Sequence, residues 1–222
     1  FRAIAALAAT LLALALATAA VTLLPSPTLA VGPDDADALG LTLALAQPLA
    51  FAFYERKPVA GRLLLSIVTL LVVGLCVILT KSRAGQLAST AALAVHFVTR
   101  LRARGLAVAA LLSAPLFVFG AHSFAGASLL GLLPAVPMLF LSFKIAAVLL
   151  GRYREDNDAA VARVWARALL ALLAGLTAGL AFVPPERHAI FWIYTGLAGA
   201  LYQAARAHDA QLGPVLIRRS RE

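Results

Sequence analysis

The sequence predicts an all-α membrane protein, a polytopic transmembrane helical bundle of about eight spans. Hydrophobic residues make up 62% of its 222 residues, charged residues make up 13%, and the mean hydropathy is +0.92. A soluble domain is roughly half apolar and a quarter charged. The apolar runs are long enough to cross a bilayer as helices, and none alternates apolar and polar residues as the strands of a membrane barrel do.

The spans follow from apolar runs that are separated by charged or turn-forming residues. The first run opens after Arg2, and the second follows the acidic turn at residues 34–37. Lys81, Ser82 and Arg83 separate the third run from the fourth, and arginine-rich segments bound several of the others. The expected spans are residues 3–24, 38–54, 63–80, 84–97, 106–120, 128–150, 168–183 and 189–205.

Some spans carry special features. The spans at 84–97 and 106–120 are short for a full crossing, so we expect them to tilt little or to have hydrated ends. Proline inside a span kinks the helix and frees a carbonyl. The prolines expected to act in this way are Pro48, Pro115, Pro134 and Pro137.

Two further segments are given an ordinary interpretation. The spacing of Gly175 and Gly179 suits close helix approach, but such spacings arise by chance in an Ala-rich chain, so no packing role is assigned to it. The segment 151–167 mixes acidic and basic residues, which is typical of a solvated cytoplasmic helix. We expect Trp165 in this segment to lie at the membrane interface.

The basic residues predict the orientation. Alternating the spans across a bilayer places fifteen of the nineteen basic residues on one side. By the positive-inside rule this side is cytoplasmic, and both termini lie there. The net charge of +9 is therefore a topology signal, and nucleic acid is excluded as a partner. The fifteen residues are Arg2, Arg56, Lys57, Arg62, Arg100, Arg102, Arg104, Arg152, Arg154, Arg163, Arg167, Arg206, Arg218, Arg219 and Arg221.

Lys81 and Arg83 break this rule, because they fall on the opposite, outer side together with Arg187. A cation held at that boundary suits an anion or a phosphate head group. The alternative is an ordinary short loop with snorkelling ends. Asp34, Asp35, Asp37, His122, Ser123, Glu186 and His188 share the outer face.

The acidic residues favour a plain structural interpretation. The turn at residues 34–37 is explained by capping and by the helix dipole, although carboxylates there also suit a metal ion. No Asp or Glu falls inside an expected span, which argues against a proton-coupled or sodium-coupled transporter.

Several short motifs resemble the bacterial O-antigen ligase and O-antigen polymerase family over about residues 30–150. The acidic turn opens a helix within residues 32–48, and residues 79–85 read Leu-Thr-Lys-Ser-Arg-Ala-Gly. Residues 121–124 read Ala-His-Ser-Phe, and the Leu-Leu-Gly-Leu-Leu segment 129–133 follows them. The resemblance implies a glycosyltransferase of lipopolysaccharide biosynthesis, which moves a glycan from undecaprenyl pyrophosphate to an acceptor sugar or the lipid A core. It implies no cofactor and no obligatory metal.

The chain also departs from that family. Members are longer, with more N-terminal helices and a large periplasmic loop that would fall between Gly120 and Ala121. We therefore expect the single transmembrane domain 1–222 to be the central and C-terminal part of a larger protein. The junction is expected to hide a missing loop, although a truncated relative that has lost the loop would look the same.

The resemblance and the chemistry together select site residues. A guanidinium at the outer leaflet would hold the leaving pyrophosphate, which points to Arg83, with Lys81 or Arg187 as a supporting cation. The acceptor hydroxyl needs a base that titrates near neutral pH, which points to His122, with His188 as the second candidate. His122 and Arg83 are the expected catalytic residues, and Lys81, Arg187 and His188 are expected to bind substrate.

Two other function classes stay open. A small polytopic protein could be a non-catalytic subunit of a larger membrane complex, with His96 as its one histidine inside an expected span. A flippase or transporter of lipid-linked sugars would need wide polar cavities between the spans. The sequence offers few polar residues inside the spans to line such cavities.

Overall fold

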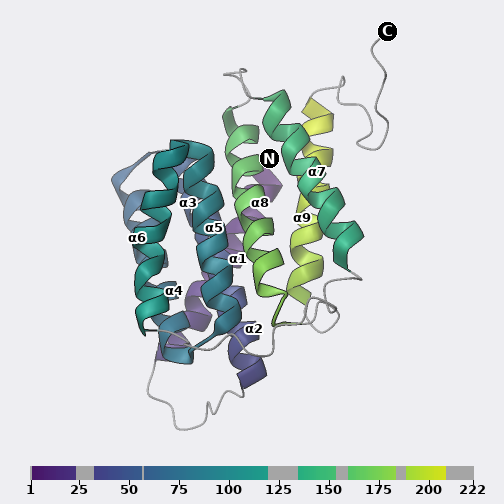
Figure 1. The fold of residues 1–222 in the computed structure, drawn as a ribbon. Coiled ribbons are helices and arrows are strands. Elements are labelled where there is room, and N and C mark those ends of the chain that lie inside the picture. The colour runs from purple at the N-terminus through teal and green to yellow at the C-terminus, as the bar shows by residue number, and fades with distance from the viewer. Residues whose placement is uncertain are drawn as a thin grey trace.

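A computed structural model describes residues 2–23, 33–56, 58–119, 135–153, 160–183 and 189–208. The regular elements in these segments are all α-helices, packed side by side as a bundle (Figure 1). The predicted all-α helical bundle is therefore confirmed. The helices are α1 (Arg2–Leu23), α2 (Pro33–Ala44), α3 (Ala46–Arg56), α4 (Ala60–Thr80), α5 (Arg83–Leu101), α6 (Ala103–Phe119), α7 (Val136–Arg152), α8 (Ala160–Gly179) and α9 (Ala189–His208).

Four stretches in the described part of the chain are long and apolar enough to cross a membrane. They are Arg2–Thr22, Ala36–Arg56, Ala60–Thr80 and Ala160–Gly179, and the second of them joins α2 to α3. Helix α6 is apolar but shorter. These lengths and compositions indicate a membrane protein.

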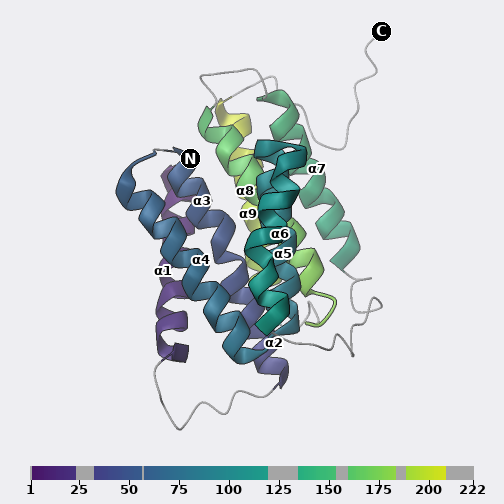
Figure 2. The same ribbon diagram turned by 60° about the vertical axis from the view of Figure 1, so that its left-hand side comes forward.

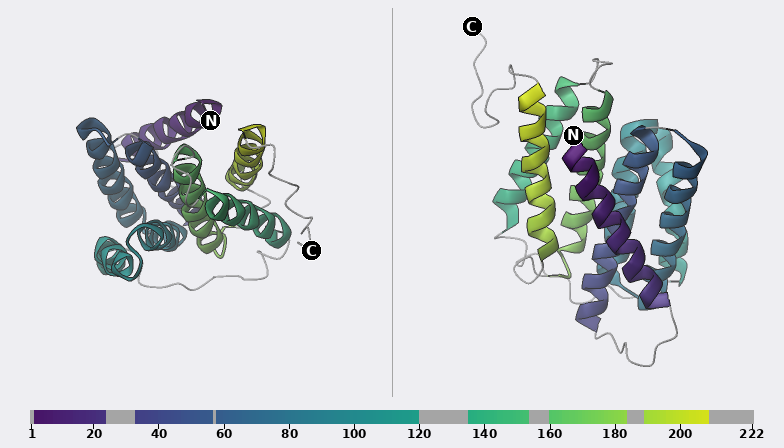
Figure 3. Two further views of the ribbon diagram at one scale, coloured as in Figure 1. Left: turned by 90° about the horizontal axis from the view of Figure 1, so that it is seen from above. Right: turned by 180° about the vertical axis from the view of Figure 1, so that it is seen from behind.

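The helices run up and down the bundle between two ends. Helices α2, α5, α7 and α9 begin at one end, which we call the Arg83 end (Figures 1 and 2). Helices α3, α5, α7 and α9 finish at the other, which we call the basic end. Helix α1 begins and α9 finishes at this same basic end (Figure 3).

The second expected span is a helix interrupted by a turn. Expected as one helix over 38–54, it is α2 followed by α3, with a turn at Leu45. Pro48 accounts for the break, because its ring crowds the carbonyl four residues earlier, in Ala44. The two helices also extend beyond the expected ends, so that Asp37 and Glu55 lie within helices. The expectation that no carboxylate falls inside a span is therefore wrong.

Helix α8 begins at Ala160, inside the segment that was expected to be a solvated helix. Trp165 is 2% exposed, and its ring meets the Phe53 ring edge-on, with 5.6 Å between centroids. Trp165 is therefore a core residue packed against α3, and its depth relative to the membrane interface stays a prediction. The apolar face of the helix continues through Ala162, Trp165, Ala166 and Leu169, all of them buried, so the arginines of this segment lie between core positions.

Gly175 and Gly179 have the packing role that the sequence did not assign to them. A Cβ added at Gly175 would lie 2.8 Å from the carbonyl oxygen of Ala88 in α5. A Cβ added at Gly179 would overlap the side chain of Leu41 in α2. Helix α8 therefore packs closely against both α2 and α5 through its glycines.

The kinks predicted at the other three prolines can now be compared with the helices. Pro115 lies inside α6, as expected. Pro137 lies in the first turn of α7, where proline fits without breaking a helix, so its predicted kink is wrong. Pro134 and the Gly120 to Ala121 junction lie outside the described residues.

Candidate functional site

Arg83 forms an ion pair with Asp37 at the Arg83 end of the bundle. Its Nε and Nη2 atoms both donate hydrogen bonds to Asp37 Oδ2, at 3.1 and 2.9 Å. The Asp37 side chain is 4% exposed, whereas the Arg83 side chain is 28% exposed. The pair therefore consists of a buried carboxylate and a guanidinium that remains partly accessible.

The second oxygen of Asp37 caps the start of α5. Asp37 Oδ1 accepts a hydrogen bond from the Ala84 backbone N–H at 3.1 Å and another from Ser82 Oγ at 3.2 Å. Ser82 Oγ in turn accepts from the Gly85 N–H at 2.9 Å. Asp37 was expected to cap its own helix, but its carboxylate instead satisfies a free N–H of α5 and places negative charge at the positive end of that helix.

Two glycines let the helices approach closely enough for this contact. Gly40 lies one turn after Asp37, and a Cβ added there would overlap Ser82 Oγ. A Cβ added at Gly85 would lie 2.9 Å from the Gly40 carbonyl carbon. The α2 and α5 backbones therefore touch at this point, which brings Asp37 against the first turn of α5.

The Phe182 ring also contacts the Arg83 guanidinium. The Arg83 Cζ atom lies 5.3 Å from the centroid of the Phe182 ring, within the range of a cation–π contact. Phe182 belongs to the turn that follows α8. Arg83 is thus fixed between α2 and the end of α8, in addition to its own helix.

Lys81 lies in the turn between α4 and α5. Its backbone is left-handed, with φ 51° and ψ 32°, and its N–H donates to the Ile78 carbonyl at 3.1 Å. The Ser82 N–H donates to the Val77 carbonyl at 3.3 Å, which completes a Schellman motif. The Lys81 side chain is exposed.

The other predicted site residues are not placed. His122, Arg187 and His188 lie outside the described residues. Helix α6 ends at Phe119, three residues before His122 in the sequence. In its last turn, the Leu116 carbonyl accepts a 2.7 Å hydrogen bond from Gln86 Nε2 of α5. This bond joins the end of α6 to α5 one turn away from Arg83.

A second charged cluster lies at the basic end. Glu55 Oε1 is 3.2 Å from Arg100 Nη1 and 3.8 Å from His96 Nε2, the latter too long for a hydrogen bond. The His96 ring stacks on Phe51, with 4.5 Å between centroids. His96 is buried in this way. Arg167 lies close enough to interact electrostatically with Glu55.

A stripe of polar residues runs along one face of α5 between the two clusters. Their spacings of three, four and seven residues place them on one helix face. Within the described residues, Gln47, Ser89 and Gln86 Oε1 have no hydrogen-bond partner, although all three side chains are buried. The interior is more polar than expected from the sequence. The stripe comprises Ser82 at the N-cap of α5 and Gln86, Ser89, His96 and Arg100 within the helix, and it contacts Asp37 at one end and Glu55 at the other.

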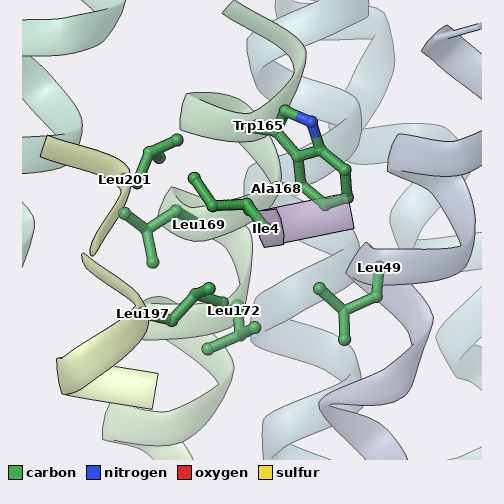
Figure 4. Close-up of a pocket in the computed structure, with 8 residues that line it drawn as sticks. All are labelled: Ile4, Leu49, Trp165, Ala168, Leu169, Leu172, Leu197 and Leu201. Carbon is green, nitrogen blue, oxygen red and sulfur yellow. The ribbon is translucent and has the colours of Figure 1, made fainter. Parts of the chain in front are cut away.

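The structure also has a small apolar cavity between α1, α3, α8 and α9 (Figure 4). Its volume of about 10 Å³ has room for no more than about one water molecule. The cavity therefore does not suit a sugar or a phosphate. It is lined by Ile4, Leu49, Trp165, Ala168, Leu169, Leu172, Leu197 and Leu201.

Comparison of the chain with protein-family models, with curated proteins and with solved structures found no match.

Proposed function

We propose that this protein is a multi-pass bacterial inner-membrane glycosyltransferase of the O-antigen ligase or polymerase type. In this proposal it transfers a glycan from undecaprenyl pyrophosphate to an acceptor sugar at the periplasmic face, where the Arg83 end lies. Both termini are then cytoplasmic. The observation that carries the proposal is a guanidinium held in one orientation at a bundle end, within the Leu-Thr-Lys-Ser-Arg-Ala-Gly motif.

The support from Arg83 is its preorganisation. Asp37 and Phe182 fix the side chain before any ligand arrives, so little side-chain entropy is lost on binding. The exposed part of the guanidinium lies next to the positive end of the α5 dipole. Both features suit a pyrophosphate, on which negative charge grows as the glycosidic bond breaks.

The Asp37 carboxylate affects how Arg83 could bind the pyrophosphate. It neutralises much of the Arg83 charge, so the carrier would share the guanidinium with Asp37 or displace it. The exposed Lys81 side chain, two residues away, adds a positive charge at the same end. In this proposal Asp37 is a positioning residue, whereas Arg83 contacts the carrier.

The proposed base is His122. It follows α6, whose last turn is bonded to α5 next to Arg83 through Gln86 and Leu116. Its imidazole would accept the proton of the acceptor hydroxyl as the bond to the sugar forms. Arg187 and His188, between α8 and α9 in the sequence, are the supporting cation and the second candidate base.

A transfer assay with purified lipid-linked glycan and acceptor tests the proposal. We expect Arg83→Ala to reduce turnover on the order of a hundredfold, and Arg83→Lys to recover part of it, because an ammonium cannot form the planar fork. His122→Ala should lower turnover more than carrier binding. Unchanged turnover in folded Arg83→Ala and His122→Ala proteins would reject the proposal.

A second candidate is a non-catalytic subunit of a larger membrane complex. The observation that favours it is that Asp37 and Arg83 already satisfy one another and tie α2 to α5. In that case Arg83→Ala would lower the stability of the protein and would have no further effect on the activity of the complex. Size measurement of the protein purified gently from its own membrane would then show a larger assembly.

A further inference from the structure

The basic end presents a concentrated positive surface. Apart from Arg83, every arginine in the described part of the chain lies at this end of the bundle. Several of them are exposed, whereas the two carboxylates with described side chains, Asp37 and Glu55, are buried and ion-paired. The exposed arginines are Arg2, Arg56, Arg100, Arg102, Arg104, Arg152 and Arg206.

The backbone of Arg102 is the feature that points to a ligand. Arg102 forms the turn between α5 and α6 with φ 55° and ψ −134°, a conformation that suits glycine and strains other residues. Its carbonyl accepts from the Gly105 N–H at 2.9 Å, and its N–H donates to the Val98 carbonyl at 2.9 Å. The turn is therefore tight, and an arginine occupies its strained position.

The neighbouring contacts hold this turn in place. Glu55 pairs with Arg100 in the last turn of α5, and a Cβ added at Gly105 would overlap the Phe97 carbonyl. Arg100, Arg102 and Arg104 alternate with apolar residues around the turn, and all three are exposed. Three guanidinium groups are thus presented on a fixed turn at one end of an apolar bundle.

We infer that the turn at Arg102 is a binding surface for the phosphate head groups of anionic phospholipids at the basic end. Clustered arginines beside membrane helices attract anionic lipids, and guanidinium groups bind phosphate oxygens in pairs. The strained backbone is retained because the Arg102 side chain is needed for this contact. The inference is independent of the transferase activity proposed above.

The test compares two glycine substitutions at positions of positive φ. Arg102 and Lys81 are the two non-glycine residues with positive φ in the described segments, and they lie at opposite ends. Arg102→Gly and Lys81→Gly should both relieve strain, so both should raise the Tm by a few degrees in phosphatidylcholine nanodiscs. Arg102→Gly should weaken the response to anionic lipid more than Lys81→Gly does.

The measurement is the Tm in phosphatidylcholine nanodiscs, with and without phosphatidylglycerol, together with the affinity for phosphatidylglycerol. We expect phosphatidylglycerol to raise the Tm of the unmodified protein, and to raise that of Lys81→Gly more than that of Arg102→Gly, and high salt to diminish the effect. Arg102→Gly should bind phosphatidylglycerol about fivefold more weakly.

Four results would overturn the inference. They are no preference of the unmodified protein for phosphatidylglycerol, an unchanged response in Arg102→Gly, and a lower Tm of Arg102→Gly in phosphatidylcholine alone. The fourth is an equal effect of free inorganic phosphate, which would identify a site for soluble anions.

Discussion

Asp37 and Arg83, 46 residues apart in the sequence, form an ion pair in which one carboxylate serves two purposes. One oxygen holds the guanidinium, and the other caps the first turn of the helix that carries it. Loss of Asp37 would therefore release the Arg83 side chain and uncap α5 at the same time. The contact connects the stability of the bundle to the geometry of the proposed site.

The first prediction concerns the energy of this pair. Asp37→Ala should destabilise the protein by about 3 kcal/mol, because it removes both the ion pair and the cap. Asp37→Asn should cost less, since the amide oxygen can still accept the Ala84 N–H. In a double-mutant cycle, Asp37→Asn and Arg83→Gln should show a coupling of about 1 kcal/mol in equilibrium unfolding. Additive effects of the two substitutions would contradict the pairing.

The second prediction concerns the contact between α2 and α5. Gly40→Ala should lower the stability of the protein, because the new methyl group would overlap Ser82. Gly196→Ala in α9 is the matched control, since a Cβ there meets nothing within 4 Å. The control should be neutral or stabilising by up to about 1 kcal/mol through helix propensity. Thermal unfolding in detergent measures both, and equal effects would show that the helices do not touch at Gly40.

The third prediction tests the position of Trp165. Because the side chain is buried against Phe53, Trp165→Ala should destabilise the protein by about 3 to 5 kcal/mol. Trp192→Ala is the control, since Trp192 is 57% exposed within the protein. A small loss for Trp165→Ala would contradict its place in the protein core. The measurement is equilibrium unfolding of both variants.

Much of the helix arrangement can be predicted from the sequence, because long apolar runs and the charges between them determine where helices begin and end. The beginning of α8 cannot be predicted in this way. Arg163 and Arg167 make the segment look solvated, although the residues between them carry an apolar face. The break at Leu45 follows from Pro48, but proline alone does not say whether a helix bends or ends.

The candidate site could be predicted only in part. Charge bias placed Lys81 and Arg83 on one face of the membrane with Asp37, and the structure brings Asp37 and Arg83 together. Their pairing could not be predicted, because hydrophobic periodicity does not say which helices touch. The available signal was local: Gly40 follows Asp37 by one turn, and Gly85 follows Arg83 by two residues, so two small residues mark the crossing.

The central claim is that Asp37 presents Arg83 to a lipid pyrophosphate, and carrier binding tests it most directly. The measurement is the affinity of the purified protein for undecaprenyl pyrophosphate, compared among the unmodified protein, Arg83→Gln and Asp37→Asn. We predict that Arg83→Gln weakens binding by about tenfold or more, since a charged hydrogen bond to phosphate is lost. Asp37→Asn should weaken binding less than Arg83→Gln does, because the guanidinium is still present but is no longer held by a carboxylate. Equal affinity in the unmodified protein and folded Arg83→Gln would contradict the claim.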